Sequence, residues 1–312
     1  MQTLIQTEGL KKYYGKKHVV RAVDDVSLQI MQGRSLALIG ESGSGKTTFA
    51  RLIGGLEKPS AGKVRFLGQE IQGTGEKTFR PLRKDMQIVF QSSGGVFDPG
   101  YTIGESIVEV LRNYEKLPRA AYEERVDEAL RRVGLDPELK NRYVTQLSGG
   151  QCQRANIARA LVLRPKLVIC DEPVSSLDYS IRKQILNLLN EIQEKYDVTY
   201  LLITHDLSNV PYVCKAVAIM YQGRILEYME GTTAIGERVM HPYSKLLYRS
   251  IPAADPRRRR LLLDEPEQTE ELHAVPKGCP FQNRCVSCTD RCRETMPPMV
   301  EREPGHQVAC YC

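Results

Sequence analysis

A glycine-rich segment that directly follows a short apolar run sets the strongest limit on the fold of this chain. The segment GESGSGKT spans 40–47, and the four residues before it, LALI, have the composition of a buried strand. This order fits the pattern GxxxxGK[ST], in which a strand leads into a tight loop and then a helix. We therefore expect an α/β fold whose parallel sheet presents this loop at the carboxyl edge of a strand.

The side chains of this loop have the chemistry of a phosphate site. Its glycines allow successive backbone N–H groups to point at a β-phosphate, and the helix that follows adds its positive end. Lys46 can reach the β- and γ-phosphates, and the hydroxyl of Thr47 is placed to bind Mg²⁺. We expect nucleotide contacts from Gly40, Ser42, Gly43, Ser44, Gly45, Lys46, Thr47 and Thr48.

Two carboxylates end a second apolar run, LVIC, and so occupy the same predicted edge of the sheet. Asp171 is expected to hold Mg²⁺, and Glu172, one residue further on, is expected to polarise the attacking water. An apolar run that ends in Asp-Glu is a weak signal by itself. Its combination with the phosphate loop predicts an ATPase site.

Two further polar residues end predicted strands and complete the candidate catalytic set. His205 ends LLIT, 33 residues after Glu172, and is expected to contact the γ-phosphate. Gln91 ends QIVF, and its amide is expected both to bind Mg²⁺ and to touch the attacking water. Either residue alone would be read as an ordinary polar strand end.

Apolar runs alternate with helical patterns through most of the chain, as in a parallel sheet with crossover helices. Earlier, Val26, Leu28 and Ile30 alternate with polar residues, which predicts a half-exposed antiparallel strand. In 121–134 the apolar residues recur at i, i+3, i+4 and i+7, the pattern of an amphipathic helix. The predicted strands of the parallel sheet are 36–40, 87–90, 167–171, 199–204 and 216–220.

Composition narrows the class of protein. The 312 residues carry a net charge of +6, part of it in the run 257–260 of four arginines, which we interpret as a solvated linker. The longest apolar runs fall far short of the roughly 20 residues that cross a bilayer, and the first residues lack the apolar core of a signal peptide. We expect a soluble chain with no nucleic-acid partner.

The motif LSGGQ, 147–151, predicts a second anion site. A Ser-Gly-Gly turn that leads into a helix presents free backbone N–H groups to a negatively charged ligand. The phosphate loop already serves one nucleotide within the chain. A second phosphate site therefore predicts a nucleotide that is held by another subunit.

With these motifs in this order, residues 3–235 resemble the nucleotide-binding subunits of ATP-binding cassette (ABC) transporters. The resemblance implies that Ser148, Gly149, Gly150 and Gln151 complete the ATP site of the opposite subunit. It also implies that Asp178, in the segment 175–178, lies at the dimer interface. Tyr14 is expected to stack on adenine, with Tyr13 as the alternative.

The segment HPYSKLLYRSIP, 241–252, and the cysteines after it resemble the tail of ATPase subunits in peptide and nickel importers. That resemblance implies two permease subunits, an extracytoplasmic binding protein and a second ATPase, with a heterodimer favoured over a homodimer. It also implies a peripheral position at the cytoplasmic face of the membrane. The expected function is ATP hydrolysis coupled to import of peptides or of a similar solute such as a nickel complex.

Six of the nine cysteines lie within the last 34 residues. Clustered thiols of this kind favour a metal site over disulfides in a cytosolic protein. Spacing alone leaves zinc and an iron–sulfur cluster open, and 285–288 is a CxxC that zinc sites also use. The resemblance implies a [4Fe–4S] cluster, with zinc as the alternative, on Cys279, Cys285, Cys292 and Cys310.

These expectations divide the chain into a nucleotide-binding domain, 1–235, with a helical subdomain at about 92–165, and a C-terminal extension, 236–312. An alternative function remains open at this stage. A soluble ABC ATPase that acts on ribosomes or nucleic acid can also carry metal-bound cysteines. Salt-dependent binding to RNA or DNA would distinguish it.

Overall fold

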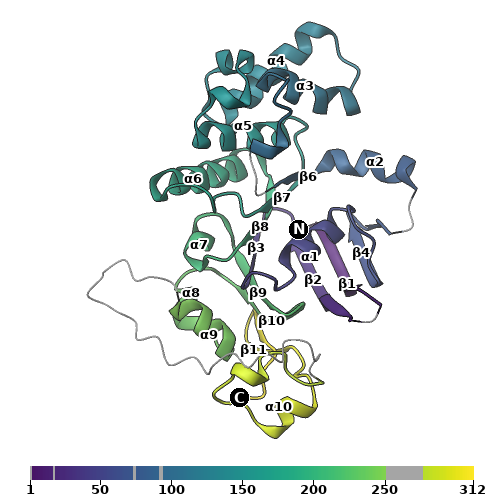
Figure 1. Cartoon of the computed structure of the whole chain (residues 1–312), viewed down its shortest axis with the longest axis vertical. Coiled ribbons are helices and arrows are strands. Elements are labelled where there is room, and N and C mark those ends of the chain that lie inside the picture. Colours follow the sequence, from purple (N-terminus) through teal and green to yellow (C-terminus); the bar gives the residue numbers. More distant parts are fainter. Residues whose placement is uncertain (1, 17, 73–74, 91–93, 251–276) are drawn as a thin grey trace.

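The computed structural model describes residues 2–16, 18–72, 75–90, 94–250 and 277–312 (Figure 1). Two sheets and a group of helices make up this part of the chain. Gln91 and the arginine run at 257–260 lie outside the described residues.

An eight-stranded sheet forms the centre of the molecule, in the order β11-β12-β10-β9-β3-β8-β7-β6. Its inner neighbours β9–β3, β3–β8, β8–β7 and β7–β6 are parallel, as predicted. The strands of this parallel part are β3 (Leu36–Ile39), β6 (Met86–Val89), β7 (Leu167–Asp171), β8 (Thr199–Thr204) and β9 (Ala216–Tyr221). Each predicted strand is therefore confirmed to within one residue at either end.

Both faces of this sheet are buried, which explains the unbroken apolar runs of its strands. In β3, Leu36 and Leu38 pack into one core, whereas Ala37 and Ile39 pack into the other. The first core also contains α1 (Lys46–Ile53), and the second contains α6 (Tyr179–Tyr196). The sheet is thus covered by a helix on each face.

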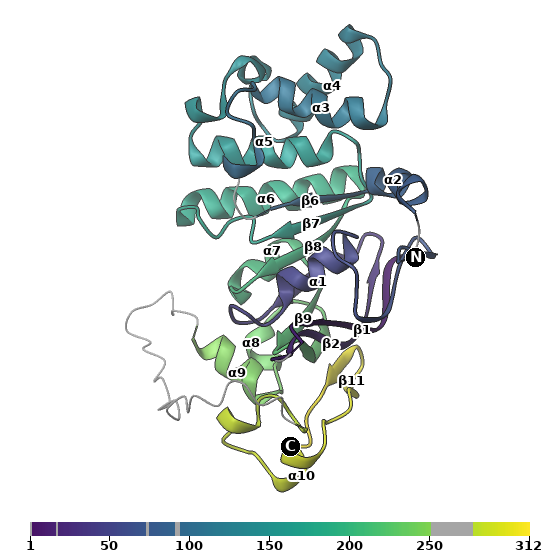
Figure 2. The same cartoon turned by 45° about the vertical axis from the view of Figure 1, so that its right-hand side comes forward.

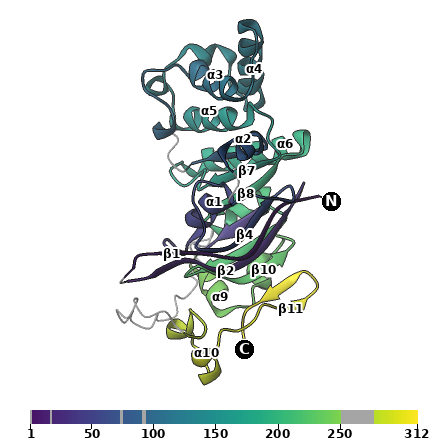
Figure 3. The ribbon, with the colours of Figure 1, turned by 90° about the vertical axis from the view of Figure 1, so that its right-hand side faces the viewer.

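A four-stranded antiparallel sheet lies beyond α1, in the order β2-β1-β4-β5 (Figure 3). Its strands are β1 (Thr3–Tyr14), β2 (Val20–Met31), β4 (Ala61–Phe66) and β5 (Gln69–Glu70). Val26, Leu28 and Ile30 are buried, and the residues between them are exposed. The predicted half-exposed strand is confirmed.

Helices α3 (Ile103–Tyr114), α4 (Arg119–Arg132) and α5 (Gly149–Leu161) form a layer at the end of the molecule away from the antiparallel sheet (Figures 1 and 2). The apolar face predicted for 121–134 is buried, with Val126, Ala129, Leu130 and Val133 at most 3% exposed. Helix α2 (Glu76–Asp85) leads into β6, and α7 (Val210–Val213) precedes β9. No helix of the described segments is long and apolar enough to cross a membrane.

The C-terminal part continues the central sheet, which the sequence did not predict. Strand β12 (His306–Val308) pairs with β10 (Arg224–Glu230), and β11 (Val300–Glu303) pairs with β12. The short helices of this part are α8 (Ile235–Arg238), α9 (Pro242–Arg249) and α10 (Asp290–Glu294). The domain limits given above stay a prediction.

One buried carboxylate joins these C-terminal elements to the sheet. Glu227 of β10 is fully buried and accepts hydrogen bonds from the backbone N–H groups of Met240, at 2.7 Å, and His241, at 3.1 Å. His306 of β12 contacts the same carboxylate through Nε2 at 2.7 Å. Glu227 therefore ties together β10, the start of α9 and β12.

Candidate nucleotide-binding site

The glycine-rich loop runs from the end of β3 into α1, and two of its glycines are required by close packing. A Cβ on Gly40 would lie 2.1 Å from the carbonyl oxygen of Met220. Gly45 has φ of +105°, and a Cβ there would lie 1.9 Å from the carbonyl oxygen of Ala22. The loop is thus held close to β9 and β2, while Ser42, Gly43 and Thr47 are exposed.

The Lys46 ammonium folds back onto the loop that it follows. Its Nζ donates to the carbonyl oxygens of Gly40 and Glu41, both at 2.8 Å. Burial lowers the pKa of Lys46, and the carboxylates of Glu172, Asp171 and Glu41 oppose that shift. A buried cation among backbone carbonyls is suited to bind a phosphate that enters the loop.

The two groups predicted to bind Mg²⁺ lie together. Thr47 Oγ1 donates to Asp171 Oδ1 at 3.3 Å, across 124 positions of sequence. Burial raises the pKa of Asp171, although the Thr47 hydroxyl lowers it in turn. A hydroxyl and a carboxylate at one point are the hard oxygen ligands that Mg²⁺ takes in nucleotide sites.

Glu172 and His205 meet at the same edge of the sheet. His205 Nδ1 lies 3.2 Å from Glu172 Oε1, and the Glu172 backbone N–H donates to Ile203 O at 3.0 Å. Glu172 has φ of +47°, a left-handed conformation that costs free energy for a residue with a side chain. Strain of this kind is typical of a residue whose side chain must be aimed at a ligand.

The two candidate adenine-stacking tyrosines differ in their surroundings. The Tyr13 hydroxyl donates to the buried carboxylate of Asp24, and Arg21 lies over the Tyr13 ring. Tyr14 is 37% exposed, and its hydroxyl donates to Glu57. The more exposed Tyr14 ring is the better candidate to stack on a base.

The LSGGQ segment forms the start of α5. Ser148 Oγ accepts from Gln151 N at 3.3 Å, and Gln151 Oε1 accepts from Ser148 N at 3.0 Å, which is a reciprocal capping box. Gly150 is buried, whereas Ser148 and Gly149 are exposed. Helix α6 and part of the sheet lie between α5 and α1 (Figure 2), so this segment is remote from the chain's own phosphate loop.

Asp178 is exposed and stands at the start of α6, and its side chain makes no capping hydrogen bond there.

The fold brings together four predicted site residues at the end of the central sheet: Thr47, Asp171, Glu172 and His205. Gln91 lies outside the described residues, and Ser148 to Gln151 lie at the start of α5.

Sequence patterns missed one residue of this site, Glu41. The motif leaves its second position free, so no pattern points to it. In the fold, Glu41 contacts Tyr243 and Arg284, more than 200 positions away. Only the pairing of distant segments could reveal these contacts.

The C-terminal cysteines approach one another around α10. Cys279 N donates to Cys292 O at 2.7 Å, and Cys312 Sγ contacts Ser287 O at 3.1 Å. Burial, with smaller contributions from Cys285, Cys292 and Cys310, raises the pKa of the Cys279 thiol to about 12. Nevertheless, the described residues contain no group of three or more His, Cys, Asp or Glu side chains that could hold a metal ion. The predicted metal-binding character of the extension is therefore not seen in this structure.

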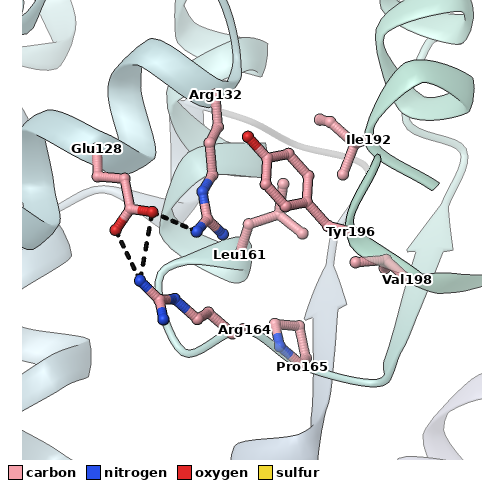
Figure 4. A pocket seen from close by; sticks show the side chains of 8 residues that line it. All are labelled: Glu128, Arg132, Leu161, Arg164, Pro165, Ile192, Tyr196 and Val198. Carbon is pink, nitrogen blue, oxygen red and sulfur yellow. Dashed lines mark hydrogen bonds and ion pairs between the residues drawn. The ribbon is translucent and has the colours of Figure 1, made fainter. Parts of the chain in front are cut away.

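A cavity of about 320 Å³ lies elsewhere, between the helical layer and the central sheet (Figure 4). Glu128 bridges Arg132 and Arg164 there, and the Arg132 guanidinium lies 4.4 Å from the centre of the Tyr196 ring. Pro165 and Val198 precede β7 and β8, so this cavity is at the sheet edge opposite the phosphate loop. Its lining residues are Glu128, Arg132, Leu161, Arg164, Pro165, Ile192, Tyr196 and Val198.

Two protein families match the sequence. The family described as ABC transporter matches residues 23–175. The family described as oligopeptide/dipeptide transporter, C-terminal region, matches residues 229–292. The first match contains the phosphate loop, LSGGQ and the Asp171–Glu172 pair, and the second contains the HPY segment and three of the four predicted cysteine ligands.

Curated proteins are similar over almost the whole chain. The oligopeptide transport ATP-binding protein OppF of Salmonella typhimurium is 41% identical, with 97% of this chain and 91% of OppF covered. The probable peptide ABC transporter ATP-binding protein y4tS of Sinorhizobium fredii is 40% identical, with 99% of this chain and 89% of that protein covered.

Solved structures share the fold. The cbiO1 protein of Clostridium perfringens, part of the ABC transporter complex cbiONQ, has a TM-score of 0.68 and 30% identity over 76% of this chain and 92% of cbiO1. The ATP-binding cassette MJ0796, in a dimeric post-hydrolysis state with ADP and Pi, has a TM-score of 0.66 and 27% identity. That match covers 73% of this chain and 98% of the MJ0796 chain.

Proposed function

The chain belongs to the family of ABC transporter ATP-binding proteins, in its oligopeptide and dipeptide group, and from that premise we propose how its residues work. It is an ABC transporter ATPase, the ATP-binding subunit of an oligopeptide importer. The observation that carries the mechanism is the meeting of Thr47, Asp171, Glu172 and His205 at the edge of the sheet where Lys46 and the phosphate loop lie.

The loop from Gly40 to Thr48 binds the phosphates of ATP, and Tyr14 stacks on the adenine. Lys46 exchanges its two loop carbonyls for the β- and γ-phosphates, which removes the cost of a buried cation without a counter-charge. Thr47 and Asp171, joined by Gln91, would hold Mg²⁺. When bound, that ion neutralises charge that develops on the transferred phosphoryl group.

Glu172 accepts a proton from the water that attacks the γ-phosphate, and His205 contacts that phosphate. The 3.2 Å approach between the two side chains supports this division, because it puts both at one reacting position. The left-handed backbone of Glu172 aims its carboxylate away from the strand. Gln91 orients the same water.

Ser148, Gly149, Gly150 and Gln151 act on the ATP of a second subunit, and Asp178 lies at the interface between the two. The free backbone N–H groups at the start of α5 support this role, since they form an anion site that the chain's own nucleotide does not reach. We favour a second, non-identical ATPase as the partner. Two permease subunits and an extracytoplasmic binding protein complete the importer, at whose cytoplasmic face this subunit is bound.

Cys279, Cys285, Cys292 and Cys310 hold a [4Fe–4S] cluster in this proposal, with zinc as the alternative. The small apolar core of the segment 277–312, which has 36 described residues, supports it, because so short a segment gains stability from a cross-link. When bound, the group cross-links the segment rather than acting in ATP hydrolysis. Iron and sulfide analysis of anaerobically purified protein tests this: zinc without sulfide contradicts the cluster.

Lys46→Ala tests the proposed function in vesicles that contain the assembled importer. ATP hydrolysis should fall by about 100-fold or more, because one cation at the developing phosphate charge is worth that much. Lys58→Ala, an exposed lysine beyond α1, should retain the wild-type rate. A wild-type rate that does not respond to peptides in the presence of the binding protein would contradict the transport role.

A further inference from the structure

Glu41, the second residue of the phosphate loop, is held from two sides by the C-terminal part of the chain. Its backbone N–H donates to the hydroxyl oxygen of Tyr243 at 2.9 Å. Its carboxylate oxygens lie 2.9 and 3.2 Å from one guanidinium nitrogen of Arg284. These contacts join the loop to α9 and to the cysteine-rich segment.

Both partners are themselves fixed by packing. Tyr243 is fully buried, and its ring centre lies 4.5 Å from that of Tyr221 and 5.4 Å from that of Phe281. The Arg284 guanidinium lies over the rings of Phe281 and Tyr221, at 5.6 and 6.0 Å. Aromatic packing of this kind restricts both side chains before any nucleotide binds.

Glu41 passes this restraint to the group that binds phosphate. Its carbonyl oxygen accepts from Lys46 Nζ at 2.8 Å, so four atoms of one residue contact Tyr243, Arg284 and Lys46. Glu41 follows Gly40, whose lack of a Cβ already allows close contact with β9. The beginning of the loop is thus held by β9, α9 and the C-terminal segment together.

We propose that Tyr243 and Arg284 are positioning residues for ATP binding, which act through Glu41 to hold the phosphate loop in its nucleotide-binding conformation. The physical reason is preorganisation: a loop that is already ordered loses less conformational entropy when ATP binds. Coupling of this kind is reciprocal, so ATP binding in turn stabilises the C-terminal segment. The inference rests on the proposed function, because it concerns the same phosphate loop.

The experiment compares the affinity of the full chain for ATP, measured by calorimetry with Mg²⁺, in four variants and the wild type. Arg284→Gln and Tyr243→Phe each remove one contact to Glu41. Arg284→Lys keeps the charge. Arg34→Gln is the matched control, because it removes another Arg–Glu pair, with Glu230 of β10, away from the loop.

Arg284→Gln and Tyr243→Phe should each raise the Kd for ATP about three- to tenfold, the usual size of one partly exposed polar contact. Arg284→Lys should recover part of that loss, and Arg34→Gln should bind like the wild type. In the assembled importer, the KM for ATP should rise while kcat changes less than twofold, about the limit for a residue that does not touch the reacting atoms.

A structural role alone gives a different result. If Arg284→Gln lowers the thermal midpoint but leaves the Kd for ATP unchanged, the proposal is wrong. Equal loss of affinity in Arg34→Gln also overturns it, because the effect would then be a general weakening of the C-terminal part. Absence of ATP binding by the wild type would instead contradict the proposed function.

Hydrogen exchange gives a second readout that is independent of affinity. Addition of ATP to the wild type should slow exchange in α9 and around Arg284. In Glu41→Gln the protection around Arg284 should be lost, whereas α9, which is held by the Glu41 backbone N–H, should keep its protection. Protection confined to the phosphate loop and α1 in the wild type would contradict the coupling.

Discussion

Glu172 has both a proposed catalytic role and a strained backbone conformation. It is one of the non-glycine residues with positive φ, yet it follows a strand whose every residue is buried. The sequence indicates a carboxylate at this strand end, but the conformation that aims it is visible only in the fold. His205 follows β8, the strand that pairs with β7, and its contact with Glu172 depends on the same geometry.

His241 is the residue whose titration we expect to affect stability most clearly. Burial, with a smaller contribution from the charge of Lys245, lowers its pKa from the usual 6.5 to about 4. The imidazole Nδ1 accepts from Tyr243 N at 3.0 Å, so protonation there would break the cap of α9. Because the unfolded chain binds the proton more readily than the folded chain, stability is complete above pH 6.5 and is lost as pH falls toward 4.

The free energy of unfolding should therefore fall by up to about 3 kcal/mol between pH 7 and pH 4 through this group alone. Urea unfolding of the wild type and of His241→Asn at both pH values measures the effect. Asn can still cap the helix but does not titrate in this range. An equal pH dependence in both proteins would show that His241 does not contribute.

At the scale of elements, the side chain of Glu227 holds β10, β12 and the start of α9 together. Glu227 is fully buried and accepts from Met240 N, His241 N and His306 Nε2. Its loss would leave buried donors without a partner, which costs more than the net value of the hydrogen bonds themselves.

Glu227→Gln should lower the free energy of unfolding by about 2–4 kcal/mol, because its amide NH₂ would take the place of one carboxylate oxygen and face at least one of those donors. Glu230→Gln, on the same strand but exposed and paired with Arg34, should change stability by no more than about 0.5 kcal/mol. Chemical denaturation of both variants at pH 7.5 makes the comparison. Similar losses in the two would argue against a special role for the buried carboxylate.

The start of α5 shows an element whose local structure and function coincide. In the capping box, the side chains of Ser148 and Gln151 accept hydrogen bonds from two backbone N–H groups of LSGGQ, one on each of these residues. The glycines between them retain free N–H groups at the helix end. The motif is therefore a helix start and, in the proposed function, also an anion site; its sequence alone predicts both.

For the whole molecule, the separation of α5 from α1 supports the proposal that two subunits share each nucleotide. Glu172→Gln should bind ATP yet hydrolyse it slowly, so that closed dimers with the partner ATPase accumulate. Size-exclusion chromatography with and without ATP measures this. Adding Ser148→Arg should prevent the dimer without lowering ATP affinity, since Ser148 does not contact the chain's own site. Phosphate release by Glu172→Gln at the wild-type rate would remove Glu172 from the mechanism.

The sequence predicted the parallel strands and the helix at 121–134 because burial on one or both faces leaves a local periodicity. It also predicted the meeting of Thr47 with Asp171 and of Glu172 with His205, since parallel strands end at a common edge. It missed the pairing of β10 with β12. Strand β12 has three residues, too few for a periodic pattern, and its partner is about 80 positions away.

By itself, then, the sequence determined the class of fold, the phosphate loop and the acidic strand end, because these depend on short segments whose chemistry and spacing are fixed by the nucleotide. The tertiary structure alone decided that the C-terminal part joins the central sheet and that Tyr243 and Arg284 contact Glu41. Such contacts depend on packing between segments that are about 80 positions apart in the sheet and more than 200 positions apart at Glu41, which no local pattern of residues encodes.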